Sequence, residues 1–232
     1  MRRFFFYVLL SSTVILSGIT TLPFLQAPSH NLLASPPLTE TLPLITILPE
    51  RPTNPGYQRS AFGEGWSHHL LPGNGAACST RQLILLDAQR EVSSSVPDQD
   101  CTVTEGEILD PYSGEILRIG HGEEDTVNVR QIEIDHIFPL AAAWDLGAAD
   151  WSKEKRIDFA NDPVNLVPTF AAWNREKSDL LPAHWLPPDK TIRCDYSRRV
   201  AFIAFTWGLS LSNDDANTMK RQCIVSDFLH YS

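Results

Sequence analysis

The sequence lacks the motifs of several common enzyme classes. It contains no G-x-S-x-G segment, so a serine hydrolase would have no nucleophile elbow. Its histidines show neither H-E-x-x-H nor H-x₃-H spacing, which argues against a zinc peptidase. No two cysteines stand as C-x-x-C, which argues against a zinc ribbon. The sequence also shows no internal repeat.

The chain has no excess of basic charge. Its 19 Lys and Arg against 28 Asp and Glu give a net charge of −9, which argues against a protein that simply coats nucleic acid. The charge is unevenly spread, because residues 87–125 hold eleven acids and two arginines. Residues 153–199 hold nine basic residues and seven acids. This second stretch is either a locally basic surface or an ordinary mixed one.

The N-terminus is typical of an export signal. Two arginines precede an apolar run over 4–16, and small or polar residues follow. We therefore expect a signal peptide over 1–27, cleaved after Ala27, with Ala34 as the alternative. An uncleaved inner-membrane anchor remains the other reading, because residues 4–25 could just span a thin bilayer. Serines, threonines and a proline in that run favour cleavage over anchoring.

A proline-rich stretch follows the signal. Residues 28–55 contain seven prolines and no clear hydrophobic period, a composition that favours extended backbone and buries little. We interpret this stretch as a linker. The folded domain is accordingly expected over 56–232, with secreted or periplasmic localisation.

Four cysteines lie in the expected domain, at Cys78, Cys101, Cys194 and Cys223. An even number in an exported protein favours two disulfides, and three pairings are possible. Local closure favours Cys78 with Cys101 and Cys194 with Cys223. We predict no free thiol.

The hydrophobic patterning predicts an α+β domain. Two β-like runs around turn residues predict a flanking β-hairpin over 106–119. Alternating β-branched residues predict a strand over 129–134 that ends at Asp135 and His136, and another strand is expected over 164–169. The expected helices are 139–146, 151–160, 170–178, 198–207 and 214–224, of which the last two close the domain.

The polar residues of these central elements suit one kind of chemistry. Asp135 and His136 end one strand, Asn165 lies on the next, and Asn174 and Lys177 are three apart on one helix face. Asp135 and Asn174 offer the hard oxygen ligands that Mg²⁺ accepts beside waters and substrate phosphate. His136 would be a general base suited to neutral pH. The set predicts metal-assisted hydrolysis of phosphodiesters.

At these residues the chain resembles the HNH, or ββα-metal, nucleases. Within them it is similar to the exported DUF1524 group, which is related to the C-terminal domain of GmrSD-type restriction proteins. The resemblance covers about 56–223 and implies an α+β fold around a ββα-metal core. The matching stretches are GYQRSAFGEGW, CSTR, GEILDPYSG, IDHIFPLAAAWDLGA, WSKEKRIDFANDPVNL, NREKSD, WLPP and CDY.

The resemblance implies a role for each matching residue. Asp135 would bind the metal and His136 would activate water. Asn165 would mainly brace the loop and orient the base, and Asn174 would be the second metal ligand. Lys177 would lie near the scissile phosphate. Weaker candidates for substrate contact are Arg81 and Arg175.

These expectations define an exported, non-specific endonuclease that depends on a divalent metal ion. Mg²⁺ is the expected ion, with Mn²⁺ as an alternative, and the products would carry 5′-phosphate and 3′-hydroxyl ends. The partner is a nucleic acid, either DNA or RNA, and the protein is expected to be a monomer. The alternative is a secreted binding or structural domain that kept the HNH scaffold without turnover, a reading that the acidic net charge favours.

Overall fold

The computed structural model of the chain describes residues 35–70, 77–92, 101–120 and 125–229. Its α-helices are α1 (Leu38–Thr41), α2 (Thr80–Val92), α3 (Leu140–Asp145), α4 (Lys153–Ala160), α5 (Ala171–Lys177), α6 (Arg193–Trp207) and α7 (Asn213–Leu229). Its strands are β1 (Ile47–Leu48), β2 (His68–Leu70), β3 (Ala77–Ser79), β4 (Gly106–Leu109), β5 (Ile116–Ile119), β6 (Ile132–His136), β7 (Leu166–Phe170) and β8 (Leu211–Ser212). Short 3₁₀ helices are η1 (Leu42–Leu44), η2 (Arg59–Phe62), η3 (Val129–Gln131), η4 (Ala148–Asp150), η5 (Pro163–Asn165) and η6 (Lys190–Ile192). The fold is α+β, as the sequence predicted.

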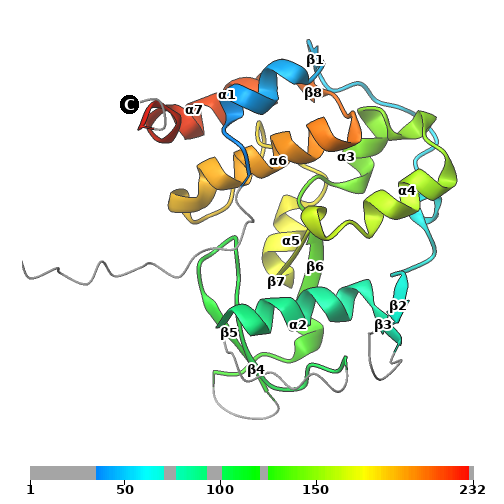
Figure 1. Cartoon of the computed structure of the whole chain (residues 1–232), viewed down its shortest axis with the longest axis vertical. Coiled ribbons are helices and arrows are strands. Elements are labelled where there is room, and N and C mark those ends of the chain that lie inside the picture. Colours follow the sequence, from blue (N-terminus) through cyan, green and yellow to red (C-terminus); the bar gives the residue numbers. More distant parts are fainter. Residues whose placement is uncertain (1–34, 71–76, 93–100, 121–124, 230–232) are drawn as a thin grey trace, which may run out of the picture.

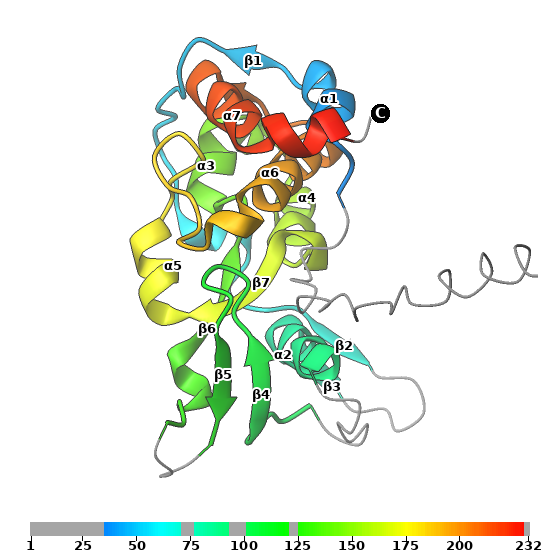
Figure 2. The ribbon, with the colours of Figure 1, turned by 90° about the vertical axis from the view of Figure 1, so that its left-hand side faces the viewer.

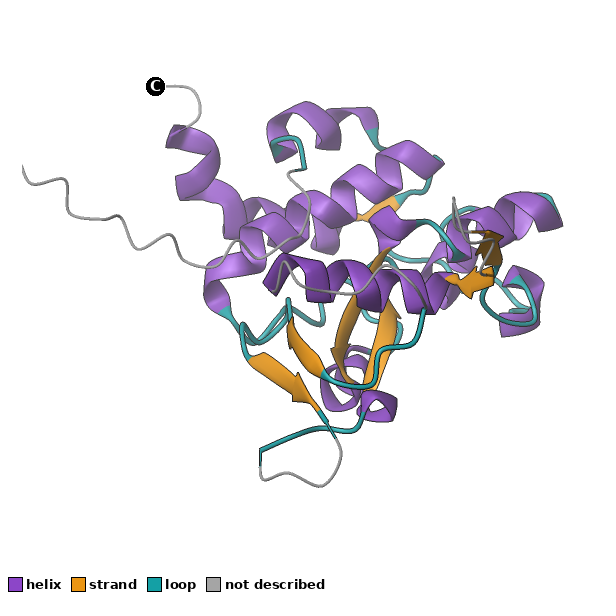
Figure 3. Cartoon of the chain, turned by 60° about the horizontal axis from the view of Figure 1, so that its bottom comes forward, coloured by secondary structure: helices purple, strands orange, loops and turns teal. Residues whose placement is uncertain are grey.

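Among the described residues the strands form four separate pairs and no single large sheet (Figures 1 and 3). The central pair is β6 with β7, antiparallel from Ile132 opposite Phe170 to His136 opposite Leu166. Helix α5 follows β7 directly and packs against both strands, whereas α3 and α4 lie in the connection from β6 to β7. The two strands and α5 together form a strand–strand–helix unit. The predicted flanking hairpin is β4 with β5, and α6 and α7 are the closing helices.

Both central strands begin later than the patterning predicted, because a 3₁₀ turn precedes each. Asn128 and Gln131 form a capping box that closes η3 before β6. The Asp162 carboxylate accepts from the backbone N–H of Val164, with Pro163 at the first position of η5. Asn165 therefore ends a 3₁₀ turn instead of lying on a strand.

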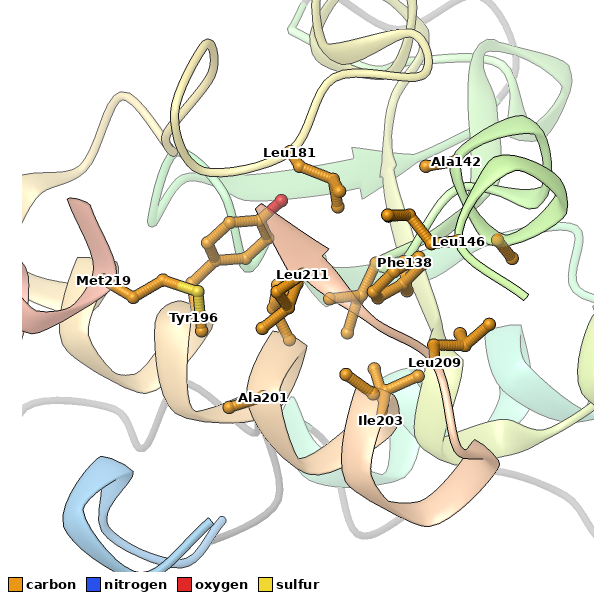
Figure 4. Close-up of a cluster of buried hydrophobic side chains, with 14 of the residues drawn as sticks. Phe138, Ala142, Leu146, Leu181, Tyr196, Ala201, Ile203, Leu209, Leu211 and Met219 are labelled. Carbon is orange, nitrogen blue, oxygen red and sulfur yellow. The ribbon is translucent and has the colours of Figure 1, made fainter. Parts of the chain in front are cut away.

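Most of the helices enclose a large apolar core. Helices α1, α3, α6 and α7 surround it in the upper part of Figure 1, and Figure 4 shows its side chains. Phe138, Tyr196, Ile203, Leu211 and Met219 are all buried there. Gly208 ends α6 in the left-handed conformation, at φ 70°, which a glycine adopts without steric cost. The disulfide Cys194–Cys223 joins α6 to α7.

A second, smaller core lies between α2, the β4–β5 hairpin and one face of β6 and β7 (Figure 2). Its residues include Ile84 and Leu85 of α2, Ile108 of β4 and Ile132 of β6. The disulfide Cys78–Cys101 lies in this core. Both disulfides have the pairing that local closure favoured, and none of the cysteines is free.

The stretch expected as a linker contributes to the large core. Leu38, Leu42 and Ile45 are buried against it, and β1 pairs in parallel with β8. The prolines do not prevent this, because Pro37 and Pro43 lie at the starts of α1 and η1, where a missing N–H costs no hydrogen bond. Residues 1–34, which include the expected signal peptide and the start of the expected linker, lie outside the described residues. Within the described ranges no helix is both long and apolar enough to cross a membrane.

Candidate active site

Asp135 occupies the face of β6 that α5 covers. Side chains alternate along a strand, so Asp135 shares this face with Glu133. Its Oδ2 accepts a hydrogen bond of 2.6 Å from the Tyr112 hydroxyl and forms an ion pair of 2.9 Å with the Lys177 Nζ. Burial raises the pKa of Asp135, and the charge of Lys177 and the bond from Tyr112 offset part of that rise. The carboxylate is thereby held in one orientation.

His136 is fixed by contacts on two sides. Its Nε2 lies 2.9 Å from the backbone carbonyl oxygen of Ala160, and because a carbonyl only accepts, Nε2 carries the proton. The Trp66 ring stacks on the imidazole, with centroids 5.7 Å apart and planes at 11°. Burial lowers the pKa of His136 to about 3. The ring is therefore neutral at pH 7, and its Nδ1 lone pair is available as a base.

Asn165 braces the chain after β6. Its Oδ1 accepts from the backbone N–H of Phe138 at 2.8 Å, and its Nδ2 donates to the carbonyl of the same residue at 3.2 Å. The backbone N–H of Ile137 donates to the Asn165 carbonyl. This fully buried amide touches the loop that follows His136, which is the bracing position that the family pattern implies.

Helix α5 carries two site residues on one face, as their spacing predicted, and in the structure both donate hydrogen bonds to β6. The Asn174 Nδ2 donates to the Glu133 carboxylate at 2.6 Å, while the Lys177 Nζ donates to the His136 carbonyl at 2.8 Å. Lys177 is fully buried, and burial lowers its pKa, an effect that Asp135 partly opposes. The expectation that Lys177 faces the scissile phosphate therefore does not hold: it lies behind Asp135, paired with it.

The two arginines expected at the substrate lie elsewhere. The Arg81 guanidinium donates to the carbonyls of Val129 at 3.2 Å and Ile132 at 2.8 Å, so it supports the start of β6 instead of a phosphate. Arg175 is exposed in the last turn of α5 and lines neither cavity beside His136. The sequence could not separate them from a site arginine, because the guanidinium carries the same charge wherever the fold places it.

Two cavities flank His136. The larger, of about 320 Å³, is lined by the loop from Arg59 to Trp66, with Leu140 and Ala160. The smaller, of about 260 Å³, is lined by Asp135, Asn174, Ser178 and Asp179, among others. Both include His136 and Arg59. A reacting group in either cavity would meet the imidazole.

Four residues of the site were missed at the level of sequence: Arg59, Trp66, Tyr112 and Glu133. Arg59 and Trp66 belong to GYQRSAFGEGW, and Tyr112 belongs to GEILDPYSG, so the matching stretches already contained them. Glu133 had a further signal, because it stands two residues before Asp135 on the same predicted strand face.

Two residues of the site could serve as ligands of a magnesium ion. Asp135 and Asn174 line one cavity and supply a carboxylate and an amide, the hard oxygen groups that Mg²⁺ accepts. Because Mg²⁺ usually keeps several waters, two protein ligands suffice. Within the part of the chain that the structure describes, no group of three or more His, Cys, Asp or Glu converges on one point.

The fold and this site define a disulfide-bonded α+β protein with a carboxylate–histidine pair on a strand–strand–helix unit. The family model of the GmrSD restriction endonucleases, C-terminal domain, matches residues 80–210, more than half of the chain. The protein belongs to this nuclease-related family.

Two further comparisons bear on the chain. An uncharacterized secreted protein of Arthroderma benhamiae is 29% identical over 177 residues, which are 75% of this chain and 78% of that protein. No solved structure matches.

Proposed function

We propose that the protein is an exported HNH-type endonuclease that hydrolyses phosphodiester bonds of nucleic acid with the help of a divalent metal ion. One observation carries this proposal: Asp135, His136 and Asn174 line the same cavity, on a strand–strand–helix unit. The family relationship supports the nuclease class. The two disulfides and the secreted relative are consistent with export.

His136 acts as the general base in this mechanism. The Ala160 carbonyl holds the proton on Nε2, so Nδ1 takes the proton of the attacking water. The Nδ1 lone pair of the neutral imidazole is the proton acceptor, because the bond to Ala160 occupies Nε2. Asn165 keeps the ring in position by fixing the loop at Phe138.

Asp135 and Asn174 would hold the metal ion, with Mg²⁺ as the expected species and Mn²⁺ as an alternative. When bound, the ion would supply positive charge that stabilises the negative charge gathering on the phosphate and on the leaving oxygen. Tyr112 and Lys177 hold the Asp135 carboxylate in one orientation. The side chain therefore loses little conformational entropy when the ion binds. The proposed products carry 5′-phosphate and 3′-hydroxyl ends.

Plasmid nicking with and without EDTA tests the proposal. We expect nicking that EDTA abolishes, and a loss of about 10²–10⁴ in rate for His136→Ala, the typical worth of a positioned general base. The matched control is His184→Ala, an exposed histidine outside both cavities, which should retain the wild-type rate.

Asp135→Ala separates the metal site from the base. It should weaken Mg²⁺ binding, so part of its lost activity should return at high Mg²⁺, whereas His136→Ala should gain nothing from added metal. Unchanged nicking by a folded His136→Ala protein would reject the mechanism. The protein would then be a secreted binding domain on the same scaffold, the reading that its net charge of −9 favours.

A further inference from the structure

We infer that Arg59 is the phosphate-binding residue of the site. It lines both cavities beside His136 and binds a backbone phosphate of the substrate there. This inference rests on the proposed function and adds the contact that function lacks. A chain with a net charge of −9 repels nucleic acid as a whole, so a local cation has to hold the substrate.

Arg59 lies where such a contact is needed. It is the first residue of η2, in the segment between β1 and β2 that passes α3 and α4 (Figure 1). It lines the cavity of about 320 Å³ and the cavity of about 260 Å³, and His136 is the other ionisable residue that the two share. A phosphate held by Arg59 would therefore lie beside the imidazole in either cavity.

The Arg59 guanidinium is also available. Its side chain is exposed, and among the described residues it forms no hydrogen bond or ion pair. Asp179, an acidic neighbour in the smaller cavity, is held instead by Arg51, whose Nη2 lies 2.9 Å from its carboxylate. A free guanidinium can donate two parallel hydrogen bonds to phosphate oxygens, which is the geometry that makes arginine a strong phosphate ligand.

The other cations near the site are already engaged. Lys177 is fully buried in its pair with Asp135. Arg81 donates to two backbone carbonyls at the start of β6, and Arg156 donates to the carbonyls of Ala61 and Trp151. In the part of the chain that the structure describes, Arg59 is thus the Lys or Arg that lines the two cavities.

Arg59→Gln tests the assignment, because glutamine keeps most of the stem and removes the charge. Full-length protein is titrated into fluorescein-labelled duplex and single-stranded oligonucleotides in EDTA, and binding is followed by anisotropy. We expect binding to weaken about 10–100-fold, the worth of a charge-assisted bidentate contact. The slope of log K against log salt should fall in magnitude by about 0.9 for the duplex, which corresponds to one phosphate.

Two further variants sharpen the result. Arg59→Lys should recover part of the binding, because a point charge remains while the planar fork is lost. Arg118→Ala is the control, since this arginine is exposed in β5, lines neither of the cavities beside His136 and pairs with Glu107 on the surface. It should leave both the affinity and the salt slope unchanged.

The outcomes distinguish this inference from the proposed function. If wild-type protein nicks DNA but Arg59→Gln binds and nicks as wild type does, the phosphate assignment is overturned and the nuclease stands. If Arg59→Gln loses binding while wild-type protein never cleaves, the phosphate site is supported and the nuclease fails. An equal loss of affinity in Arg118→Ala would also overturn the assignment, because it would show a diffuse charge effect.

Discussion

The two cores of this protein differ in what builds them, and the site lies between them. Helices α1, α3, α6 and α7 form the large core, whereas one helix, α2, and the β4–β5 hairpin form the small one. One disulfide ties each core, Cys194–Cys223 in the large and Cys78–Cys101 in the small. The β6–β7 pair contributes to both, with Ile132 in the small core and Val167 in the large.

The small core constrains the site through the two faces of β6. Asp135 and Glu133 face α5, where polar side chains hold them, while Ile132 and Ile134 face the small core. A strand that carries ligands on one face and core residues on the other cannot shift its register without exposing one and burying the other. The apolar face therefore fixes the polar one, and the following predictions test that dependence.

The largest effect is expected for Lys177→Met. The change leaves the Asp135 carboxylate buried with Tyr112 as its remaining side-chain partner, and breaking a buried ion pair from one side costs about 3–5 kcal/mol. Urea unfolding measures the loss, and the exposed Lys153→Met is the matched control. The double variant with Asp135→Asn should be less destabilised than the sum of the single changes. A Lys177→Met protein with the wild-type midpoint would contradict the pairing.

Removal of either disulfide should lower the free energy of unfolding by nearly the same amount, but each removal should loosen a different core. The pairs are separated by 23 and 29 residues, so loop entropy gives about 3.5 kcal/mol for each. Hydrogen exchange in double Cys→Ser variants should show lost protection in α2, β4 and β5 for Cys78–Cys101. For Cys194–Cys223 the loss should lie in α6 and α7. Uniform loss in both variants would mean that the two cores unfold as one unit.

The pH dependence of stability should show the burial of His136. Its folded pKa, about 3, lies below its unfolded value of 6.5, so the unfolded state takes up the proton first as the pH falls. The stability advantage of wild type over His136→Gln is full above pH 7 and should shrink by about 2 kcal/mol by pH 5. Unfolding in EDTA at the two pH values measures it. A constant difference would mean that the imidazole titrates normally.

The smallest effect is expected for Tyr112→Phe. It removes the hydroxyl that donates to Asp135 at 2.6 Å, a bond to a charged group worth about 1.5 kcal/mol. Tyr196→Phe is a matched control, because this neighbouring ring is equally buried and its hydroxyl has no hydrogen-bond partner among the described residues. The melting temperature should therefore be lower for Tyr112→Phe and should not be lower for Tyr196→Phe. Equal shifts would show that packing, and not the bond to Asp135, decides the cost.

The sequence by itself determined the local parts of this protein. Alternation and turn chemistry predicted the strands that carry Asp135 and His136 and the helix that presents Asn174 and Lys177 on one side, because both depend on neighbours a few residues apart. Short chain separation favoured the observed cysteine pairs. The acidic composition and the absence of other enzyme motifs excluded several classes of function.

Only the tertiary structure decided which of these residues can meet a substrate. Lys177 is buried behind Asp135, and Arg81 is bound to backbone carbonyls. Arg59, from a distant segment, lines the same cavities as His136. The tertiary structure also places Leu38 and Leu42 in the large core, although the prolines of residues 28–55 predicted a linker there. The physical reason is that burial depends on contacts between residues far apart in the chain, and a charged or apolar residue carries no local sign of the partner that will cover it.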